Sequence, residues 1–349
     1  MGVTTHNNNS LVETSRFINE TGLKERFGKL IIQWEVILVL MFLFEIILFS
    51  NISPYFLDYF NLMNATFTFM EKAILALPMI FVIMSGDIDI SVAAIIALCS
   101  FSMGYAAAAG VGAAGLVVTG LAVGTAAGAF NGFFITRFGM PAIAVTLASS
   151  SLFRGVSQAV LEDQAYTKYP DAFAYFGQGY VGDSVIPFEL LLFVILATVM
   201  GYILHKTTYG RKLYAIGNSE SAARFSGVRV NRIRMMNFML NGLFAGISAV
   251  LLTSRIGSTR PNIALGFELE AITLVVLGGV SISGGKGNIF GVVLAVFFIG
   301  YLKFGMGLMM LSAKVMIITT GLLLIIAVLL PGVLDTIKGR RKLARQQME

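Results

Sequence analysis

Residues 115–135 read GLVVTGLAVGTAAGAFNGFFI, a stretch of the chain in which no side chain is charged. At a rise of about 1.5 Å per residue, a helix of this length crosses a hydrocarbon core of roughly 30 Å. Glycine recurs every four residues within it, at Gly120, Gly124, Gly128 and Gly132, so one helical stripe is almost bare of side chains. Because small residues let membrane helices approach closely, the segment predicts a transmembrane helix packed tightly against a neighbour.

Comparable apolar runs make up most of the chain. Hydrophobic residues account for 56% of its 349 residues and charged residues for 13%, and the mean hydropathy is +0.82. Charged residues make up about a quarter of a typical soluble protein, so this composition excludes that class. We therefore expect an all-α, polytopic membrane protein with about ten transmembrane helices, at residues 31–50, 67–84, 88–108, 115–135, 142–160, 188–204, 235–253, 269–280, 289–306 and 315–330. The run at 269–280 is short for a full crossing, and few residues separate 67–84 from 88–108, so broken or re-entrant helices are open alternatives there.

Lysine and arginine gather in alternate connections between these runs. Most of the 25 such residues lie at 16–29, 137, 206–234, 286 and 338–345. Since positively charged loops are retained in the cytoplasm, both termini are expected there. This predicts a cytoplasmic tail at 1–30, a transmembrane domain at 31–335 and a basic cytoplasmic tail at 336–349. Membrane topology and anionic lipid headgroups then explain the net charge of +6 without any nucleic acid partner.

Residues suited to metal, redox or nucleotide chemistry are scarce. Cys99 is the only cysteine, and His6 and His205 lie far apart, so no disulfide and no zinc or haem ligand set can be assembled. The phosphate-binding pattern Gly-x-x-x-x-Gly-Lys-Ser/Thr does not occur, because Gly285-Lys286 is followed by Gly287. We therefore expect no catalytic residue, no metal and no cofactor in this chain.

The basic connection at about 205–234 carries the signals of a short helix. Ser219 is a good N-cap, residues 221–225 are compatible with a helix, and Gly227 is a good stop. These signals predict one short cytoplasmic helix, bracketed by glycines, that can dock into a groove on a partner. An incidental helix in a positively charged loop is the alternative.

The run from Gly210 to Val228 resembles the coupling loop in permease subunits of bacterial ribose-type sugar ABC importers, which belong to the branched-chain amino acid/ribose permease superfamily. Its pattern is Gly-Arg…Ala-Ile-Gly-Asn…Ala-Ala…Ser-Gly-Val. Further stretches resemble signatures of that family in the same order: SGDIDIS at 85–91, FNG at 130–132, GFELEAI at 266–272 and LGGVSISGGKG at 277–287. Residues 162–180 are similar to permeases of rhamnose importers, and autoinducer-2 permeases are close relatives.

The resemblance implies one transmembrane subunit of a larger importer in the bacterial inner membrane. The solute would be a small sugar, with rhamnose preferred and autoinducer-2, ribose or another monosaccharide as alternatives. The partners implied are a second permease subunit, identical or related, two cytoplasmic ATPase subunits that bind ATP, and a periplasmic sugar-binding protein. Arg211 and Arg224 are expected to secure docking of an ATPase, with Phe225 as the buried anchor. The full set of implied ATPase-coupling residues is Gly210, Arg211, Gly217, Asn218, Glu220, Ala222, Ala223, Arg224, Phe225 and Gly227.

Polar side chains near the apolar runs are candidates for a gate or for the solute path, because exposing an ionisable group to lipid costs several kcal/mol. For Asp87 and Asp89 the alternative role is a helix cap or an ion pair. Asn237 and Asn241 share a helix face and suit interhelical hydrogen bonds. The glycine stripe at residues 120–132 either packs against another helix or lines the path of the solute. An ion-coupled secondary transporter is the alternative of another class, with Asp87, Asp89 and Glu45 as its relay. The gate and pathway candidates are Asp87, Asp89, Asn131, Asn237 and Asn241.

Overall fold

The computed structural model describes residues 34–162 and 164–346, with side chains described as far as residue 329. This part of the chain is helical and contains no β-strand, which confirms the predicted all-α class. The main helices are α2 (Trp34–Ile52), α3 (Tyr59–Ala65), α4 (Met70–Met84), α5 (Val92–Ala108), α6 (Ala113–Phe138), α7 (Ala142–Leu161), α8 (Tyr175–Gln178), α9 (Phe188–Lys206), α10 (Thr208–Asn218), α11 (Glu220–Phe225), α12 (Val230–Ile256), α13 (Phe267–Leu277), α14 (Ile289–Leu308) and α15 (Ala313–Gln346).

Each of the ten predicted spans coincides with one of these helices. By length and composition, five of the described helices can cross a membrane: α2, α6, α9, α12 and α14. The segment Tyr59–Thr68 and α4 make a sixth candidate, bent by 58° at their junction. This bend lies between Thr68 and Met70, before the second predicted span, and not between the second and third spans, where a broken helix was an open alternative. Ten crossings remain a prediction.

Several boundaries differ from those that the sequence predicted. The third span begins at Val92 instead of residue 88, because residues 85–91 form an irregular link. The eighth, α13, has 11 residues and follows Gly266, whose positive φ of 84° ends the preceding loop. The last, α15, continues as a helix to Gln346, through much of the segment expected to be a tail. The tail predicted at 1–30 lies outside the described residues.

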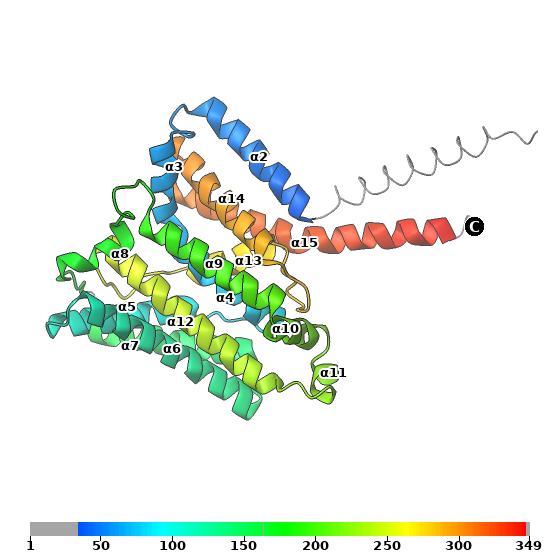
Figure 1. The fold of residues 1–349 in the computed structure, drawn as a ribbon, viewed down its shortest axis with the longest axis horizontal. Helices are drawn as coiled ribbons and strands as arrows, with labels where there is room; N and C mark the ends of the chain where they lie inside the picture. Colours follow the sequence, from blue (N-terminus) through cyan, green and yellow to red (C-terminus); the bar gives the residue numbers. More distant parts are fainter. Residues whose placement is uncertain (1–33, 163, 347–349) are drawn as a thin grey trace, which may run out of the picture.

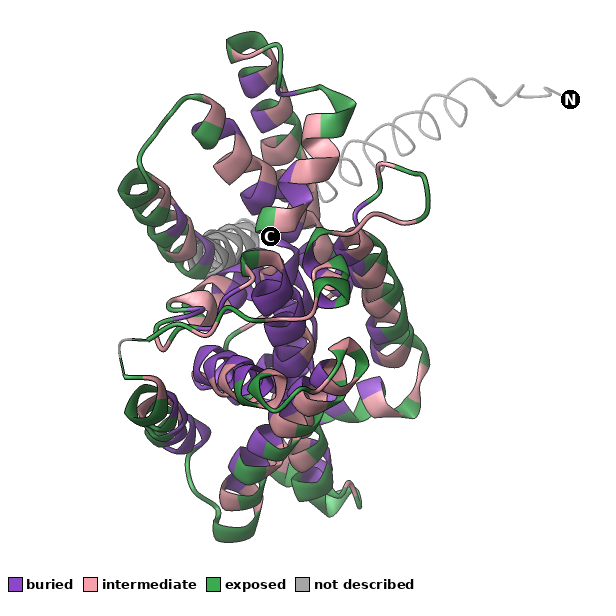
Figure 2. Cartoon of the chain, turned by 90° about the vertical axis from the view of Figure 1, so that its left-hand side faces the viewer, coloured by how far each residue is buried: buried purple, intermediate pink, exposed green. Residues whose placement is uncertain are grey.

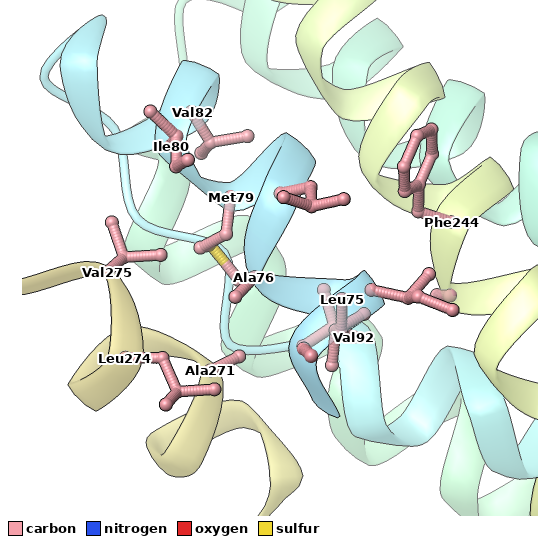
Figure 3. Packing of buried hydrophobic residues seen from close by; sticks show 14 of the residues in the cluster. Leu75, Ala76, Met79, Ile80, Val82, Val92, Phe244, Ala271, Leu274 and Val275 are labelled. Atoms are coloured by element: carbon pink, nitrogen blue, oxygen red, sulfur yellow. The ribbon is translucent and has the colours of Figure 1, made fainter. Parts of the chain in front are cut away.

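The centre of the bundle is α4, in which every residue except Lys72 is buried. A helix that is apolar on all sides is stable only when other elements surround it. Side chains of α4 such as Leu75, Ala76 and Met79 pack among residues of α5, α12 and α13 (Figure 3). Buried residues gather on the central helices and exposed ones on the outer helices (Figure 2). The exposed face carries large apolar side chains of α2, α6, α7, α9 and α15, which suits contact with lipid.

The most extensive helix contact joins α6 and α12. A Cβ atom on Gly124 would overlap the carbonyl of Gly242, and one on Gly128 would overlap the carbonyl of Phe238. The predicted glycine stripe therefore lies against a second stripe, on α12, that contains Gly242 and Gly246. Backbone contact of this kind is available only to residues without a side chain. The two helices can be treated as one packed unit.

Candidate coupling site

The connection between α9 and α12 contains two helices, α10 and α11, at one end of the bundle (Figure 1). Ser219 separates them and caps α11 by accepting a hydrogen bond from the amide of Ala222 (3.3 Å). The predicted cap and the stop at Gly227 are therefore present, but the prediction of a single helix is wrong. The sequence does contain a signal for α10: its buried residues, Leu213 and Ile216 among them, recur every three residues on one face.

Two glycines allow α10 to lie against the end of the bundle. A Cβ atom on Gly210 would overlap the carbonyl of Leu204, so the chain folds back directly on the end of α9. A Cβ atom on Gly217 would overlap the carbonyl of Met84 and the amide of Gly285. That amide itself donates to the Met84 carbonyl at 3.0 Å. The end of α10 is thus in backbone contact with the end of α4 and with the link before α14.

Further hydrogen bonds hold α10 in this position. The Tyr214 hydroxyl donates to the carbonyl of Gly287 at 2.7 Å, and the Tyr209 hydroxyl donates to the side chain of Asn237 at 2.6 Å. The Asn218 side chain lies beside Gly285, close enough to crowd any Cβ atom there. Gly210, Gly217 and Asn218, all expected coupling residues, therefore fix α10 to the bundle.

An ion-pair chain joins α11 to the interior. Arg234, at the start of α12, lies with its Nη1 3.2 Å from Glu220 of α11 and its Nε 2.8 Å from Asp87 of the α4–α5 link. Burial raises the pKa of Asp87 to about 6, and the Arg234 guanidinium opposes that rise. Arg234 therefore connects α11 with the link at the end of α4. The sequence pointed to Glu220 and Asp87 but not to Arg234, because nothing local distinguishes Arg234 from other basic loop residues.

Arg224 faces its own chain. Its Nη2 donates to Glu220 (2.7 Å) and to Asn231 (2.6 Å), and Asn231 in turn donates to the carbonyl of Thr136 at the end of α6. The residue expected to secure docking thus also supports α11 from within. Ala223, on the inner side of the same helix, is buried.

The outer side of α10 and α11 is open. Phe225 has 93% of its surface exposed at the end of α11, and its neighbours Ala222 and Gly227 are exposed too. Arg211 is exposed on α10. We call this set, Arg211, Ala222, Phe225 and Gly227, the coupling surface. It combines an exposed phenyl group, a cation and small residues on two helices whose inner sides contact the bundle.

The five gate and pathway candidates form buried contacts. The Asn241 side chain donates to Asp89 (2.8 Å), Asp89 accepts from the hydroxyl of Ser91 (2.6 Å), and Asn131 donates to the same hydroxyl (2.8 Å). Asn237 donates to Ser85 at 3.0 Å. These bonds connect α12 and α6 to the α4–α5 link, as expected if the residues form interhelical hydrogen bonds instead of a gate. None of the five lines the cavities described below.

The relay of the alternative transporter class is not brought together. Asp87 pairs with Arg234 and Asp89 with Asn241, whereas Glu45 lies on α2, which packs against α14. The Glu45 carboxylate has no hydrogen-bond partner among the described residues.

The other ends of α4 and α12 carry a second group of charges. Glu71 of α4 pairs with Arg255 of α12 at 2.5 Å. Next to it, Lys72 of α4 and Lys303 of α14 both contact Glu270 of α13, at 3.0 and 2.7 Å. Arg234 and Arg255 are separated by a length of α12 of about 32 Å, close to the thickness of a hydrocarbon core.

A bundle of apolar helices, five or six of them able to span a bilayer, is the architecture of a multi-pass membrane protein. Residues 61–330 match the family described as the permease component of the branched-chain amino acid transport system, and the chain belongs to this family.

Several curated relatives are similar along most of their length. The ribose import permease protein of Bacillus subtilis (strain 168) is 36% identical over 287 residues, which cover 82% of this chain and 88% of that one. The autoinducer 2 import system permease protein of Photorhabdus laumondii is 34% identical over 310 residues, or 87% and 91% of the two chains. The ribose import permease protein of Haemophilus influenzae is 30% identical over 330 residues, covering 93% and 98%. No solved structure matches the chain.

Proposed function

We propose that this chain is the transmembrane permease subunit of an ATP-driven importer of a small sugar in the bacterial inner membrane. The family and the names of the relatives support an import permease. The observation that carries the ATP-driven mechanism is the coupling surface, an exposed phenyl group on a short helix whose other side is ion-paired to the core. Exposed apolar groups on a rigid support are typical of protein interaction sites.

The mechanism follows from the contacts behind that surface. Closure of two partner ATPase subunits around ATP would displace α10 and α11 together. Gly217 would transmit the displacement to the end of α4, and Arg234 would transmit it to Asp87 and α12. Since α6 packs on α12 without intervening side chains, both helices would tilt as one unit. Such tilting alternates the open side of the path, and no chemistry takes place on this chain.

Two further partners complete the proposal. A second permease subunit, identical or related, would form the other half of the path, and a periplasmic binding protein would deliver the solute. The coupling helices and the polar loops near Arg260 lie at opposite ends of α12, so an ATPase and a binding protein can dock at the same time.

The solute itself is the finer part of the proposal. Residues 162–180 are similar to rhamnose permeases, and on them we propose rhamnose first. The relatives bear the names of ribose and autoinducer-2 permeases, which makes those two solutes the alternatives. Uptake of labelled L-rhamnose, D-ribose and autoinducer-2 should be measured in cells with and without the gene. Rhamnose uptake that requires the gene is the expected result, and uptake of only one of the others would replace the solute while keeping the class.

Energy coupling requires its own test. We expect uptake to survive collapse of the membrane potential while ATP is maintained, and to stop when ATP is depleted. The variant Phe225→Ala should fold and insert normally, because its side chain is almost fully exposed, yet it should lose ATP-driven uptake and ATPase stimulation. Phe60→Ala, another exposed phenyl group at the far end of the bundle, is the matched control. Uptake that stops with the membrane potential would instead indicate an ion-coupled transporter.

A further inference from the structure

A polar cavity of about 590 Å³ lies at the end of the bundle away from α10 and α11. Gln158 and Glu162 line it from the end of α7, Gln164 from the following loop, and Arg260 and Asn262 from the loop after α12. Its volume lies within the range of pockets that bind small molecules, about 300–1,000 Å³.

The two helices that lead to the cavity fix its position. The first turns of α7 lie beside the α4–α5 link, where the Thr146 hydroxyl donates to the carbonyl of Ile88 (3.4 Å). The first turn of α12 carries Arg234, which is paired with the coupling helix α11. The cavity lies beyond the last turns of both helices, so by the proposed function it faces the side from which solute arrives.

The backbone of the cavity loop is held from two sides. Tyr166 and Thr259 exchange two backbone hydrogen bonds, at 3.0 and 2.9 Å. The Nη1 of Arg154 donates to the carbonyls of Pro261 (3.0 Å) and Ile263 (3.3 Å). A loop fixed in this way positions the side chains that it carries.

Those side chains are available for a ligand. The side chains of Gln158, Gln164, Arg260 and Asn262 make no hydrogen bond to any described residue. Among the described residues of the lining, Arg260 supplies a positive charge and Glu162 a negative one, so a solute ion of either sign meets repulsion as well as attraction. The amides provide both donors and acceptors. A solute with several uncharged hydroxyl groups, each able to donate and accept, satisfies this lining best.

A second cavity of about 340 Å³ shares Arg260 and Asn262 and continues toward the core. Lys72 and Arg255 line it, and each is already paired with a carboxylate, Glu270 and Glu71 respectively. It is also lined by Ser258, which is 6% exposed and whose hydroxyl has no partner among the described residues, and by the ring of Phe267, which the Lys72 ammonium approaches to 4.6 Å. A buried hydroxyl without a partner is costly unless a ligand or water satisfies it. Hydroxyl and aromatic groups together suit a sugar, which has polar edges and apolar faces.

We propose that Asn262, Arg260 and Gln158 bind the solute directly as it passes from the binding protein into the permease, selecting an uncharged polyhydroxy compound. This inference rests on the proposed sugar transport. Asn262 and Arg260 belong to both cavities, so they would contact the solute first and pass it inward.

The test is transport by the complete importer, with its ATPase subunits and binding protein, in proteoliposomes supplied with labelled L-rhamnose or D-ribose. We expect Asn262→Leu and Gln158→Leu each to reduce the solute moved per ATP hydrolysed by about fivefold, the effect of losing one hydrogen bond. Stimulation of the ATPase by the loaded binding protein should remain as in the wild type. Asn51→Leu, the same exchange at the outer end of α2, is the matched control, and Asn262→Ala serves if the leucine variant does not insert.

Three other outcomes would overturn the inference. Unchanged solute per ATP in both cavity variants would show that these side chains do not contact the solute. Loss of ATPase stimulation along with transport would assign them to docking of the binding protein. A wild-type importer that moves neither sugar, nor autoinducer-2, with ATP would contradict the proposed function itself, and the variants are not needed to recognise that result.

Discussion

The two ends of the α4–α12 pair are built alike and connected differently. At each end a carboxylate of or beside α4 meets an arginine of α12, Asp87 with Arg234 and Glu71 with Arg255. Arg234 also contacts Glu220 on the exposed helix α11, whereas Arg255 meets a fully buried carboxylate within the bundle. Arg234 therefore links the interior to an exposed helix that a partner can displace, whereas Arg255 pairs with a carboxylate inside the bundle.

This difference indicates which end moves and which end holds. Glu220 lies near the surface, with 38% of its side chain exposed, so its contact with Arg234 can exchange partners at small cost. Glu71 is 0% exposed, and its pair with Arg255 is expensive to break. Lys72, Glu270 and Lys303 extend the far end to α13 and α14, so several helices are joined there. We infer that force enters at Arg234 and that the Arg255 end acts as the fixed point. The variants below test this inference, beginning with the largest expected effect.

Replacing the committed arginine should have the greatest effect on stability. Arg255→Met leaves Glu71, which is 0% exposed, without its partner, and the expected loss is about 3–5 kcal/mol of unfolding free energy. Thermal unfolding of the purified permease in detergent measures it. Arg224→Met, at a half-exposed pair, is the matched exchange and should cost less than about 1 kcal/mol. Equal losses of unfolding free energy in Arg255→Met and Arg224→Met would show that burial does not decide how much an ion pair stabilises this protein.

Replacing Arg234 should reduce stability less than Arg255→Met does, but it should reduce ATP-driven uptake more. Arg234→Met leaves Asp87, which is 6% exposed, without its cation, whereas Glu220 keeps its pair with Arg224. Because burial already raises the pKa of Asp87 to about 6, this carboxylate can take up a proton when the cation is removed, and we expect a loss of about 1–3 kcal/mol. ATP-driven uptake should nevertheless fall close to background, because α11 would no longer be linked to the α4–α5 link. ATP hydrolysis and uptake measured on the same proteoliposomes separate the two effects. Full uptake in Arg234→Met would show that force passes through the Gly217 contact alone.

Local patterns predicted the helices better than the links between them. Apolar runs located all ten predicted helices, and Ser219 was correctly read as a cap, since both signals lie within a few residues of sequence. The pairing of Asp87 with Arg234 joins positions 147 residues apart, and nothing near either residue specifies the other. The same holds for the glycines of α12 that face the predicted stripe on α6.

The cavity residues were missed for a related reason. Arg260 and Asn262 lie in a short loop whose sequence resembles any other polar connection, and their position beside the cavity depends on Arg154 and on the end of α7. Asn131, Asn237 and Asn241 stood out in the sequence because they interrupt apolar runs. In the structure their side chains donate hydrogen bonds to groups of the α4–α5 link, namely Ser91, Ser85 and Asp89. Polarity within a span shows that a group needs a partner, and the fold decides whether that partner is protein or solute.

The smallest expected effect concerns pH at the shared end. Burial raises the pKa of Asp87 to about 6 from 3.8, so the folded protein holds this proton more tightly than the unfolded chain does. The contribution of Asp87 to stability is then greatest at low pH and is lost as pH rises through about 6. Lowering the pH from 7.5 to 6 should increase the unfolding free energy by about 0.4 kcal/mol through this group.

The measurement is the difference in stability between the wild type and Asp87→Asn at pH 6 and 7.5, which cancels the titration of every other group. An increase at pH 6 in the wild type alone means that burial outweighs the attraction of Arg234 at this site. No difference between the two pH values means that the ion pair with Arg234 dominates and keeps the pKa of Asp87 at or below its ordinary value of 3.8. In that case both ties are committed to the core, and the end that moves must be identified by the Gly217 contact instead.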